Sequence, residues 1–481
     1  MSVRRGTWRR ARKKQHWQYW KGYAGKRMSA LSDKFSRLSA LKPANGRVAQ
    51  PTELRAPDEV DTLARLLGAA VARNHYGEHL SVRNWFSSPE FVEPSPGVLE
   101  LICRTATPPK KSVRARAGYA ALLKEKLAAA SDPGKWLFLD TETTGLSGGT
   151  GTYAFLVGLA WWDSGGLQVE QFLLRDHSEE HSLLHELAGR IAERPVLVTY
   201  NGKTFDWPLL ESRFTMTRAI PVPHLAAHLD LLHPARAVWK MRLGSVRLVD
   251  IEQRILDPAR LGWHRENDVV SSQIPQYYFD YLRGGTAHPL RGVVRHNEMD
   301  LRGLAALFGK LNSLLNEEPS NFAKEHSLDL FGLSRFLNKR GEKVRAHSAC
   351  SHALEGDLPL AYRGQATREL AFLAKRQGDT DGAATLWEEI TSDPQEGWMA
   401  SEQLAMHYER NVKDFEQALR FAELALLKVR RQNARLQDRQ TADRMARIEE
   451  KLMARVKRLQ MRKQRESETR RTPLLAAKAI A

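Results

Sequence analysis

Residues 135–312 alternate strand-like and helix-like runs, and this alternation restricts the possible folds more than any other feature of the chain. Runs of apolar residues predict strands at 136–140, 152–162, 167–174 and 194–200. Helical spacing of apolar residues predicts helices over 179–193 and from residue 204 onward. Successive strands followed by strand and helix in alternation are typical of an α/β domain with a mixed sheet and flanking helices. We expect residues 113–315 to form this domain.

The composition becomes helical beyond residue 320, and a weak repeat spans residues 320–427. Three stretches share a helix, a polar turn with Gly or Asn, and a second helix rich in alanine. Their corresponding alanines, Ala346, Ala383 and Ala418, lie 37 and 35 residues apart, close to the tetratricopeptide period of about 34. We expect an all-α, tetratricopeptide-like region of three stacked helical hairpins, with an ordinary helical bundle as the alternative.

Positive charge is concentrated at the two ends of the chain. The 481 residues carry +18, of which residues 1–30 contribute +10 and residues 428–481 contribute +11, so the remainder carries −3. Trp17 and Trp20 lie among the N-terminal cations, where aromatic rings stack on bases while cations meet phosphates. We interpret residues 1–30 as a basic aromatic arm for nucleic acid, with a merely solvated cationic segment as the alternative. Residues 428–481 lack glycine and predict one long exposed basic helix or a short coiled coil.

Residues 31–112 contain no motif that indicates a function. An amphipathic helix is expected over 58–74, and a linker is expected at 105–112.

The number of cysteines and the absence of long apolar runs indicate in which cellular compartment the protein is expected. Cys103 and Cys350 are the only cysteines, which excludes a disulfide framework and a cysteine-rich zinc site. The N-terminus lacks the apolar core of a signal peptide, and no eighteen-residue apolar run occurs. We therefore expect a cytoplasmic protein with no membrane partner.

Carboxylates follow two of the predicted strands. Asp140 and Glu142 are two residues apart and therefore point to the same side of a strand, where like charges repel unless a cation lies between them. Asp206 begins the helix after the strand at 194–200, and His296 and Asp300 share a face of a later helix. Hard oxygen ligands favour Mg²⁺ or Mn²⁺. The alternative for any one of these acids is a solvated surface position.

Three stretches, FLDTETTGLSGGTGTYAFLVGLAWW, LVTYNGKTFDWPLLESR and RHNEMD, together resemble the DEDD superfamily of 3′-to-5′ exonucleases. More narrowly, they resemble the YprB-type ribonuclease H-like domain, which tetratricopeptide-like repeats often follow. The resemblance covers residues 135–312 and implies a ribonuclease H-like fold and hydrolysis of single-stranded DNA or RNA from its 3′ end. It also implies two Mg²⁺ or Mn²⁺ ions held by Asp140, Glu142, Asp206 and Asp300. His296 matches the superfamily position that orients or deprotonates the attacking water, although its spacing from Asp300 follows the members that have tyrosine.

The same resemblance implies substrate contacts beside the carboxylates. Thr143, Thr144, Gly145 and Leu146 match the segment that contacts the terminal nucleotide in relatives, although a plain glycine-rich hairpin explains the segment equally well. Asn201 is expected to touch the substrate, and Lys203 is expected to meet a phosphate. His224, His228 and His233 are expected to lie half-exposed on a helix rather than to bind zinc.

Two other functions remain open from the sequence. The chain could be a scaffold that binds nucleic acid without cutting it and recruits a protein partner through its repeats. It could also be an endonuclease for branched or structured nucleic acid, because the same metal site permits that reaction.

Overall fold

The computed structural model describes residues 57–87, 113–145, 151–259, 261–434 and 438–478. The expected arm over residues 1–30 and the linker at 105–112 lie outside these residues.

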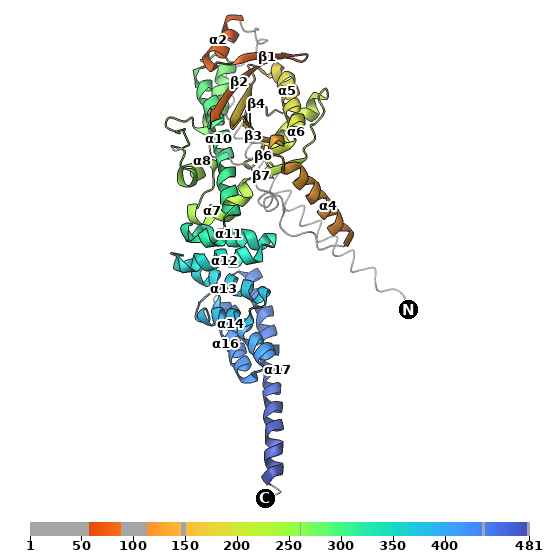
Figure 1. Cartoon of the computed structure of the whole chain (residues 1–481), viewed down its shortest axis with the longest axis vertical. Helices are drawn as coiled ribbons and strands as arrows, with labels where there is room; N and C mark the ends of the chain where they lie inside the picture. The colour runs from red at the N-terminus through yellow and green to blue at the C-terminus, as the bar shows by residue number, and fades with distance from the viewer. Residues whose placement is uncertain (1–56, 88–112, 146–150, 260, 435–437, 479–481) are drawn as a thin grey trace, which may run out of the picture. The chain divides into compact units, whose positions relative to one another are not determined.

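Within the described residues, seven strands form one mixed sheet in the order β1, β2, β5, β4, β3, β6, β7 (Figure 1). Their bounds are β1 Ala70–Asn74, β2 Gly77–Ser87, β3 Trp136–Thr143, β4 Ala154–Asp163, β5 Gly166–Leu173, β6 Val196–Thr199 and β7 Ala227–Asp230. The neighbours in the run β1, β2, β5, β4 and β3 pair antiparallel. Strand β6 pairs parallel with β3 on one side and with β7 on the other. The carboxyl ends of β3, β6 and β7 therefore meet at one edge of the sheet.

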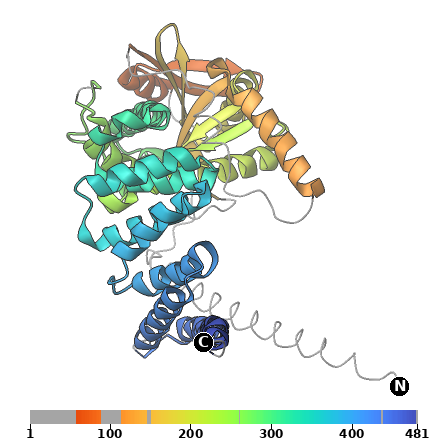
Figure 2. The same ribbon diagram turned by 60° about the horizontal axis from the view of Figure 1, so that its bottom comes forward.

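Helices cover both faces of the sheet (Figure 2). The helices of this domain are α2 Pro57–Leu67, α4 Val113–Ala130, α5 Glu180–Glu193, α6 Asp206–Thr217, α7 Leu232–Leu243, α8 Leu248–Ile251, α9 Ile274–Leu282 and α10 His288–Asn316. Of these, α4 packs on the core only near its C-terminal end. Trp136 and Phe138 pack on the face covered by α7 and α10, while Leu137 and Leu139 pack on the face covered by α5, α6 and α9. Because side chains alternate along a strand, Asp140 and Glu142 continue the α10 face. The expected α/β sheet with flanking helices is confirmed.

Two local predictions are wrong. The helix expected over 58–74 ends at Leu67, and the chain then forms β1 and β2, which extend the sheet beyond β5. The helix expected around His224, His228 and His233 is instead β7 followed by α7, because β7 completes the parallel edge beside β6. β1 and β7 have only five and four residues, and the pairing of β2 with β5 joins segments that are distant in the sequence.

The region beyond residue 320 is helical, as expected. Its helices are α11 Ser327–Arg340, α12 Lys343–Glu355, α13 Leu360–Gln377, α14 Thr380–Glu389, α15 Gly397–His407, α16 Phe415–Asn433 and α17 Arg439–Lys478. The three repeat stretches form the α11–α12, α13–α14 and α15–α16 hairpins, stacked in sequence (Figure 1). Gly341 and Gly378 end the first helix of two hairpins with a left-handed backbone. The corresponding Ala346, Ala383 and Ala418 are fully buried, because small side chains let paired helices approach.

The C-terminal basic segment is not one free helix from residue 428. Helix α16 continues to Asn433, and α17 returns along it, burying Leu452 and Leu459 against α16. Three arginines of α17, at 455, 458 and 462, surround the buried carboxylate of Glu409. Part of the positive charge in this segment therefore neutralises an internal acid and is not available to a ligand.

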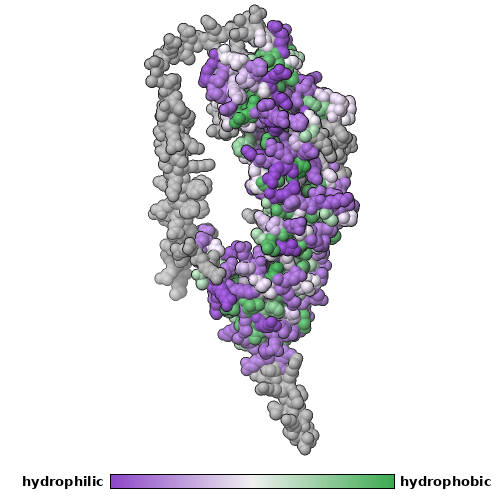
Figure 3. Space-filling view, turned by 90° about the vertical axis from the view of Figure 1, so that its left-hand side faces the viewer, coloured by the Kyte–Doolittle hydropathy of each residue, from purple (hydrophilic) through white to green (hydrophobic). Residues whose placement is uncertain are grey.

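The surface seen in Figure 3 is mostly hydrophilic, with smaller hydrophobic patches between the polar residues. Among the described residues, none of the helices combines the length and apolar character that crossing a membrane requires.

Candidate active site

Asp140 and Glu142 lie at the carboxyl end of β3, beneath α10. In the β3–β4 register Asp140 lies opposite Gly158, and a Cβ on Gly158 would overlap the side chain of Asn297 and come within 2.8 Å of Leu301 Cδ1. The absence of a side chain at this position lets α10 pack directly on the sheet. Asn297 Nδ2 then donates a hydrogen bond of 2.8 Å to Asp140 Oδ2.

A buried amide fixes the orientation of Asn297. Gln171 Nε2, from β5, donates to Asn297 Oδ1 at 2.8 Å and to the carbonyl oxygen of Val294 at 2.8 Å. Because Asn297 Oδ1 is occupied in this way, its amide NH₂ must face Asp140. The same helix presents His296 and Asp300 to the carboxyl end of β3.

Asp206 reaches the site from the other side of the strand end. It is the first residue of α6, and Thr141 Oγ1 donates a hydrogen bond of 2.6 Å to Asp206 Oδ1. The preceding loop turns at Asn201, which has a left-handed backbone with φ of 69°. Asp230, at the end of β7, accepts hydrogen bonds from the backbone amides of Asn201 and Lys203 at 2.9 and 3.2 Å. The buried Asp230 is thus a positioning residue for the loop that carries Asp206.

The carboxylates affect one another electrostatically. Burial first, and then Asp300, Asp206 and Glu142, raise the pKa of Asp140 well above its usual range. The pKa of Glu142 is raised for the same reasons, first by burial and then by Asp300 and Asp206. Burial also raises the pKa of Asp206, against the hydrogen bond from Thr141. Negative charge is therefore concentrated at this edge without enough local positive charge to balance it.

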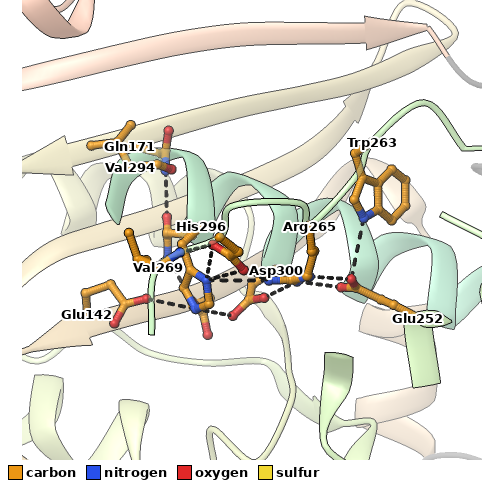
Figure 4. A network of polar contacts seen from close by, with 12 residues as sticks. Glu142, Gln171, Glu252, Trp263, Arg265, Val269, Val294, His296 and Asp300 are labelled. Atoms are coloured by element: carbon orange, nitrogen blue, oxygen red, sulfur yellow. Dashed lines mark hydrogen bonds and ion pairs between the residues drawn. The ribbon is translucent and has the colours of Figure 1, made fainter. Parts of the chain in front are cut away.

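His296 lies between two of the carboxylates (Figure 4). Its Nδ1 is 2.8 Å from Asp268 Oδ2, and its Nε2 is 3.6 Å from Asp300 Oδ2 and 3.9 Å from Glu142 Oε1. A carboxylate can only accept, so Nδ1 donates to Asp268, and Nε2 faces the acids.

Arg265 is the cation nearest this cluster. Its guanidinium forms two hydrogen bonds of 2.6 and 2.7 Å to the fully buried Glu252, one of 2.9 Å to Asp268, and an ion pair with Asp300. Gly303 of α10 makes room for the Glu252 carboxylate, which a Cβ there would overlap. Burial still raises the pKa of Glu252 despite Arg265. Arg265 is shared among three acids and leaves Asp140 and Asp206 unpaired with any cation that the described residues supply.

The donor set suits a hard cation in its chemistry and its charge. The groups that face one another are carboxylates, which Mg²⁺ and Mn²⁺ prefer, and their raised pKa values indicate missing positive charge. As the side chains lie, no three His, Cys, Asp or Glu residues in the described part of the chain surround one point closely enough to hold an ion.

A family model matches the sheet domain of this chain, and a known protein matches a longer part of it. A family model described as the RNase_H superfamily matches residues 137–312. The protein named "Uncharacterized protein YprB" of Bacillus subtilis (strain 168) is 32% identical over 292 residues, which cover 60% of this chain and 68% of that protein. The chain belongs to the YprB family. Its RNase H superfamily domain indicates a function in nucleic-acid processing.

One solved structure is a weaker match. The structure of the family B DNA polymerase from the hyperthermophilic archaeon Pyrobaculum calidifontis is 16% identical, with a TM-score of 0.29, and the match covers 50% of this chain but only 29% of that chain. We base nothing on that likeness.

The structure of this YprB-family chain brings Asp140, Glu142, Asp206, His296 and Asp300 together, as the sequence predicted. Their roles as metal ligands and base stay predictions.

The predicted substrate contacts lie beside this cluster. Thr144 exchanges backbone and hydroxyl hydrogen bonds with Tyr153, and Thr143 Oγ1 donates to the carbonyl oxygen of Gly145, so this segment closes the β3–β4 hairpin. Leu146 lies outside the described residues. Asn201 and Lys203 are in the loop that Asp230 holds, and the Lys203 side chain is exposed.

Sequence analysis missed four residues of the site: Glu252, Arg265, Asp268 and Asn297. Asn297 lies inside the motif RHNEMD, where its position next to His296 could have identified it. The other three lie in a segment between α8 and α9 that has no helical or strand periodicity over most of its length. Only the tertiary structure shows that this segment folds against α10.

Proposed function

We propose that this protein is a metal-dependent 3′-to-5′ exonuclease that hydrolyses phosphodiester bonds of single-stranded nucleic acid. The observation that carries the proposal is the convergence of four mutually repelling carboxylates at one sheet edge in an RNase H superfamily domain. Such crowding costs stability, and functional sites are where proteins retain it.

Asp140, Glu142, Asp206 and Asp300 would hold two Mg²⁺ or Mn²⁺ ions, and their oxygen donors and unbalanced charge fit that role. Bound there, the ions would supply an activated water and stabilise the departing 3′ oxygen. Asp300 would exchange its ion pair with Arg265 for this coordination, and Arg265 would keep Glu252 and Asp268 neutralised.

His296 would act as the general base. Asp268 fixes Nδ1 as the protonated nitrogen, which leaves Nε2 as an acceptor on the side of Glu142 and Asp300. A water between these groups could pass its proton to Nε2, and Asp268 would stabilise the resulting imidazolium. Asp268 is thus a positioning residue that acts through His296.

Thr143, Thr144 and Gly145 would contact the terminal nucleotide, and Asn201 and Lys203 would contact its backbone. The 3′-to-5′ direction depends on the family resemblance. The low cysteine content supports a reducing, cytoplasmic setting.

The test is hydrolysis of matched, 5′-labelled DNA and RNA strands with Mg²⁺, Mn²⁺ or EDTA. We expect labelled strands that shorten one nucleotide at a time from the 3′ end with either metal, and no shortening in EDTA. Asp140→Asn should reduce the rate by more than about 100-fold, since it removes a direct ligand rather than an outer-sphere contact. Asp163→Asn, at the exposed far end of β4, is the matched control and should retain the wild-type rate.

The ion pair between Arg265 and Asp300 favours a second candidate. If Arg265 stays bound, the chain is a scaffold that holds nucleic acid without cutting it. Strand binding with no product in any metal would support this scaffold and refute the nuclease. Cleavage of a circular single strand would instead identify an endonuclease, because an exonuclease needs an end.

The stacked hairpins support a tetratricopeptide-like assignment for α11 to α16, with a protein partner as their proposed ligand. The fully buried alanines and the glycine helix ends recur at the expected spacing.

A further inference from the structure

A basic cavity lies between the sheet domain and the first repeat helix. It has a volume of about 570 Å³, and its walls include α7 and α11. Helix α7 contributes Arg236 and Lys240, and α11 contributes Arg335, Lys339 and Arg340. Residues four apart share a face of a helix, and like charges at that spacing destabilise it. Two such cationic pairs facing one cavity therefore indicate a polyanionic ligand. We call this cavity the α7–α11 groove.

Little negative charge is available inside the groove. Asp230 is the one acid among its described lining residues, and backbone amides already occupy both of its oxygens. Arg335 pairs with Glu369 at 3.5 Å. Throughout the described part of the chain, Arg236 and Lys339 form no ion pair, and both are exposed.

The two walls are held close together. Gly332 of α11 lies directly on α7, because a Cβ there would come within 2.7 Å of the carbonyl oxygen of Ala237 and closer still to that of Val238. Arg242 of α7 pairs with the buried Asp329 of α11 at 2.8 Å. This packing keeps the two cationic helices side by side.

The groove continues toward the candidate active site. Lys203, three residues before Asp206, lies on its lining. A second cavity of about 590 Å³ includes Asn201 and shares Arg236 and Lys240 with the first. A continuous basic surface thus runs from α11, along α7, to the loop that carries Asp206.

We propose that the α7–α11 groove binds the sugar–phosphate backbone of the single strand whose 3′ end lies at the carboxylates. The volume is that of a pocket for a drug-sized ligand, which suits a few linked nucleotides of a single strand. The position of the 3′ end rests on the proposed function, whereas binding in the groove requires no catalysis. The first repeat hairpin would then be part of the substrate site.

The test is binding of a fluorescent twelve-nucleotide single strand, measured by anisotropy in EDTA over a series of salt concentrations. The variant combines Arg236→Gln with Lys339→Gln. The matched control combines Arg291→Gln with Lys324→Gln, which removes two exposed cations outside both cavities. Thermal unfolding of each variant verifies that it is folded.

We expect the negative slope of log affinity against log salt to become shallower by about 1.4, since each lost contact to a single strand contributes about 0.7 to its magnitude. At 0.1 M salt this corresponds to about 25-fold weaker binding. The control variant should bind as the wild type does. Equal affinities and slopes for the two variants would overturn the proposal, as would a duplex that depends on the groove as strongly as the single strand does.

Cleavage separates this proposal from the nuclease proposal. A wild-type protein that binds strands through the groove but forms no product in Mg²⁺ or Mn²⁺ would refute the nuclease and leave the groove standing. A groove variant that cleaves a dinucleotide normally but a twelve-nucleotide strand poorly would support both the nuclease proposal and the groove proposal.

Discussion

Asp140→Asn tests whether the carboxylates are crowded for function, because the substitution should stabilise the protein while abolishing its activity. In the wild type, Asp140 is surrounded by three other carboxylates and receives one hydrogen bond, from Asn297. The new side chain keeps the shape and an oxygen that accepts the same bond from Asn297 Nδ2. It removes the charge and the repulsion, and its NH₂ group can donate to the neighbouring carboxylates.

The size of the gain follows from the raised pKa of Asp140. Each unit by which the folded-state pKa exceeds the unfolded one costs about 1.4 kcal/mol once both states are ionised. Stabilising substitutions commonly add about 0.5–2 kcal/mol, so we expect a gain of about that size at pH 8 in EDTA. Because the folded state holds its protons to higher pH, wild-type stability should fall as pH rises from about 4. In the variant this slope should be shallower.

Urea unfolding at pH 5 and pH 8, in EDTA and in Mg²⁺, measures the stability gain, its dependence on pH and the effect of the metal. A ligand at 100 times its Kd adds about 2.7 kcal/mol, so Mg²⁺ should stabilise the wild type and stabilise Asp140→Asn less. The Asp163→Asn control should stay within about 0.5 kcal/mol of the wild type in EDTA. A variant less stable than the wild type in EDTA at pH 8 would refute the reasoning, since the charge would then be compensated.

Two further substitutions test the packing around the site. Arg265→Met should destabilise the protein by about 3–5 kcal/mol, because it leaves the fully buried Glu252 unpaired. Arg247→Met removes an exposed ion pair and should change the stability little. Equal losses of thermal stability in Arg265→Met and Arg247→Met would show that Arg265 does not neutralise a buried acid. Gly158→Ala should cost about 1–3 kcal/mol and lower the hydrolysis rate, since the new methyl group forces α10 off the sheet. Gly189→Ala, on a helix with open space around it, should be neutral or stabilising by up to about 1 kcal/mol, and equal losses in the two alanine variants would show that α10 does not need this close contact.

The sequence by itself determined the elements that local patterns encode. The strands β3, β4 and β5 were predictable because each begins or continues as a run of apolar residues bounded by turn residues, and α10 because its apolar residues recur at helical spacing. The carboxylates at the ends of β3 and β6 were predictable for a related reason. A carboxylate near the end of a buried strand is costly to keep charged, so its presence there indicates a function. Parallel strands place their carboxyl ends at one edge of a sheet, so such carboxylates are expected to meet.

The tertiary structure alone decided the contacts that join distant segments. Strands β2 and β7 pair with the free edges of β5 and β6, and β1 pairs with β2 in turn. β1 and β7 have only five and four residues, too few for a periodic pattern to reveal them. The ion pairs of Arg265 with Glu252 and Asp268 depend on a segment of irregular backbone packing against α10. The cations of α7 and α11, nearly 100 residues apart, are ordinary surface charges in the sequence. They face one another only because Gly332 brings the two helices into contact, and packing of that kind depends on shapes that no local pattern records.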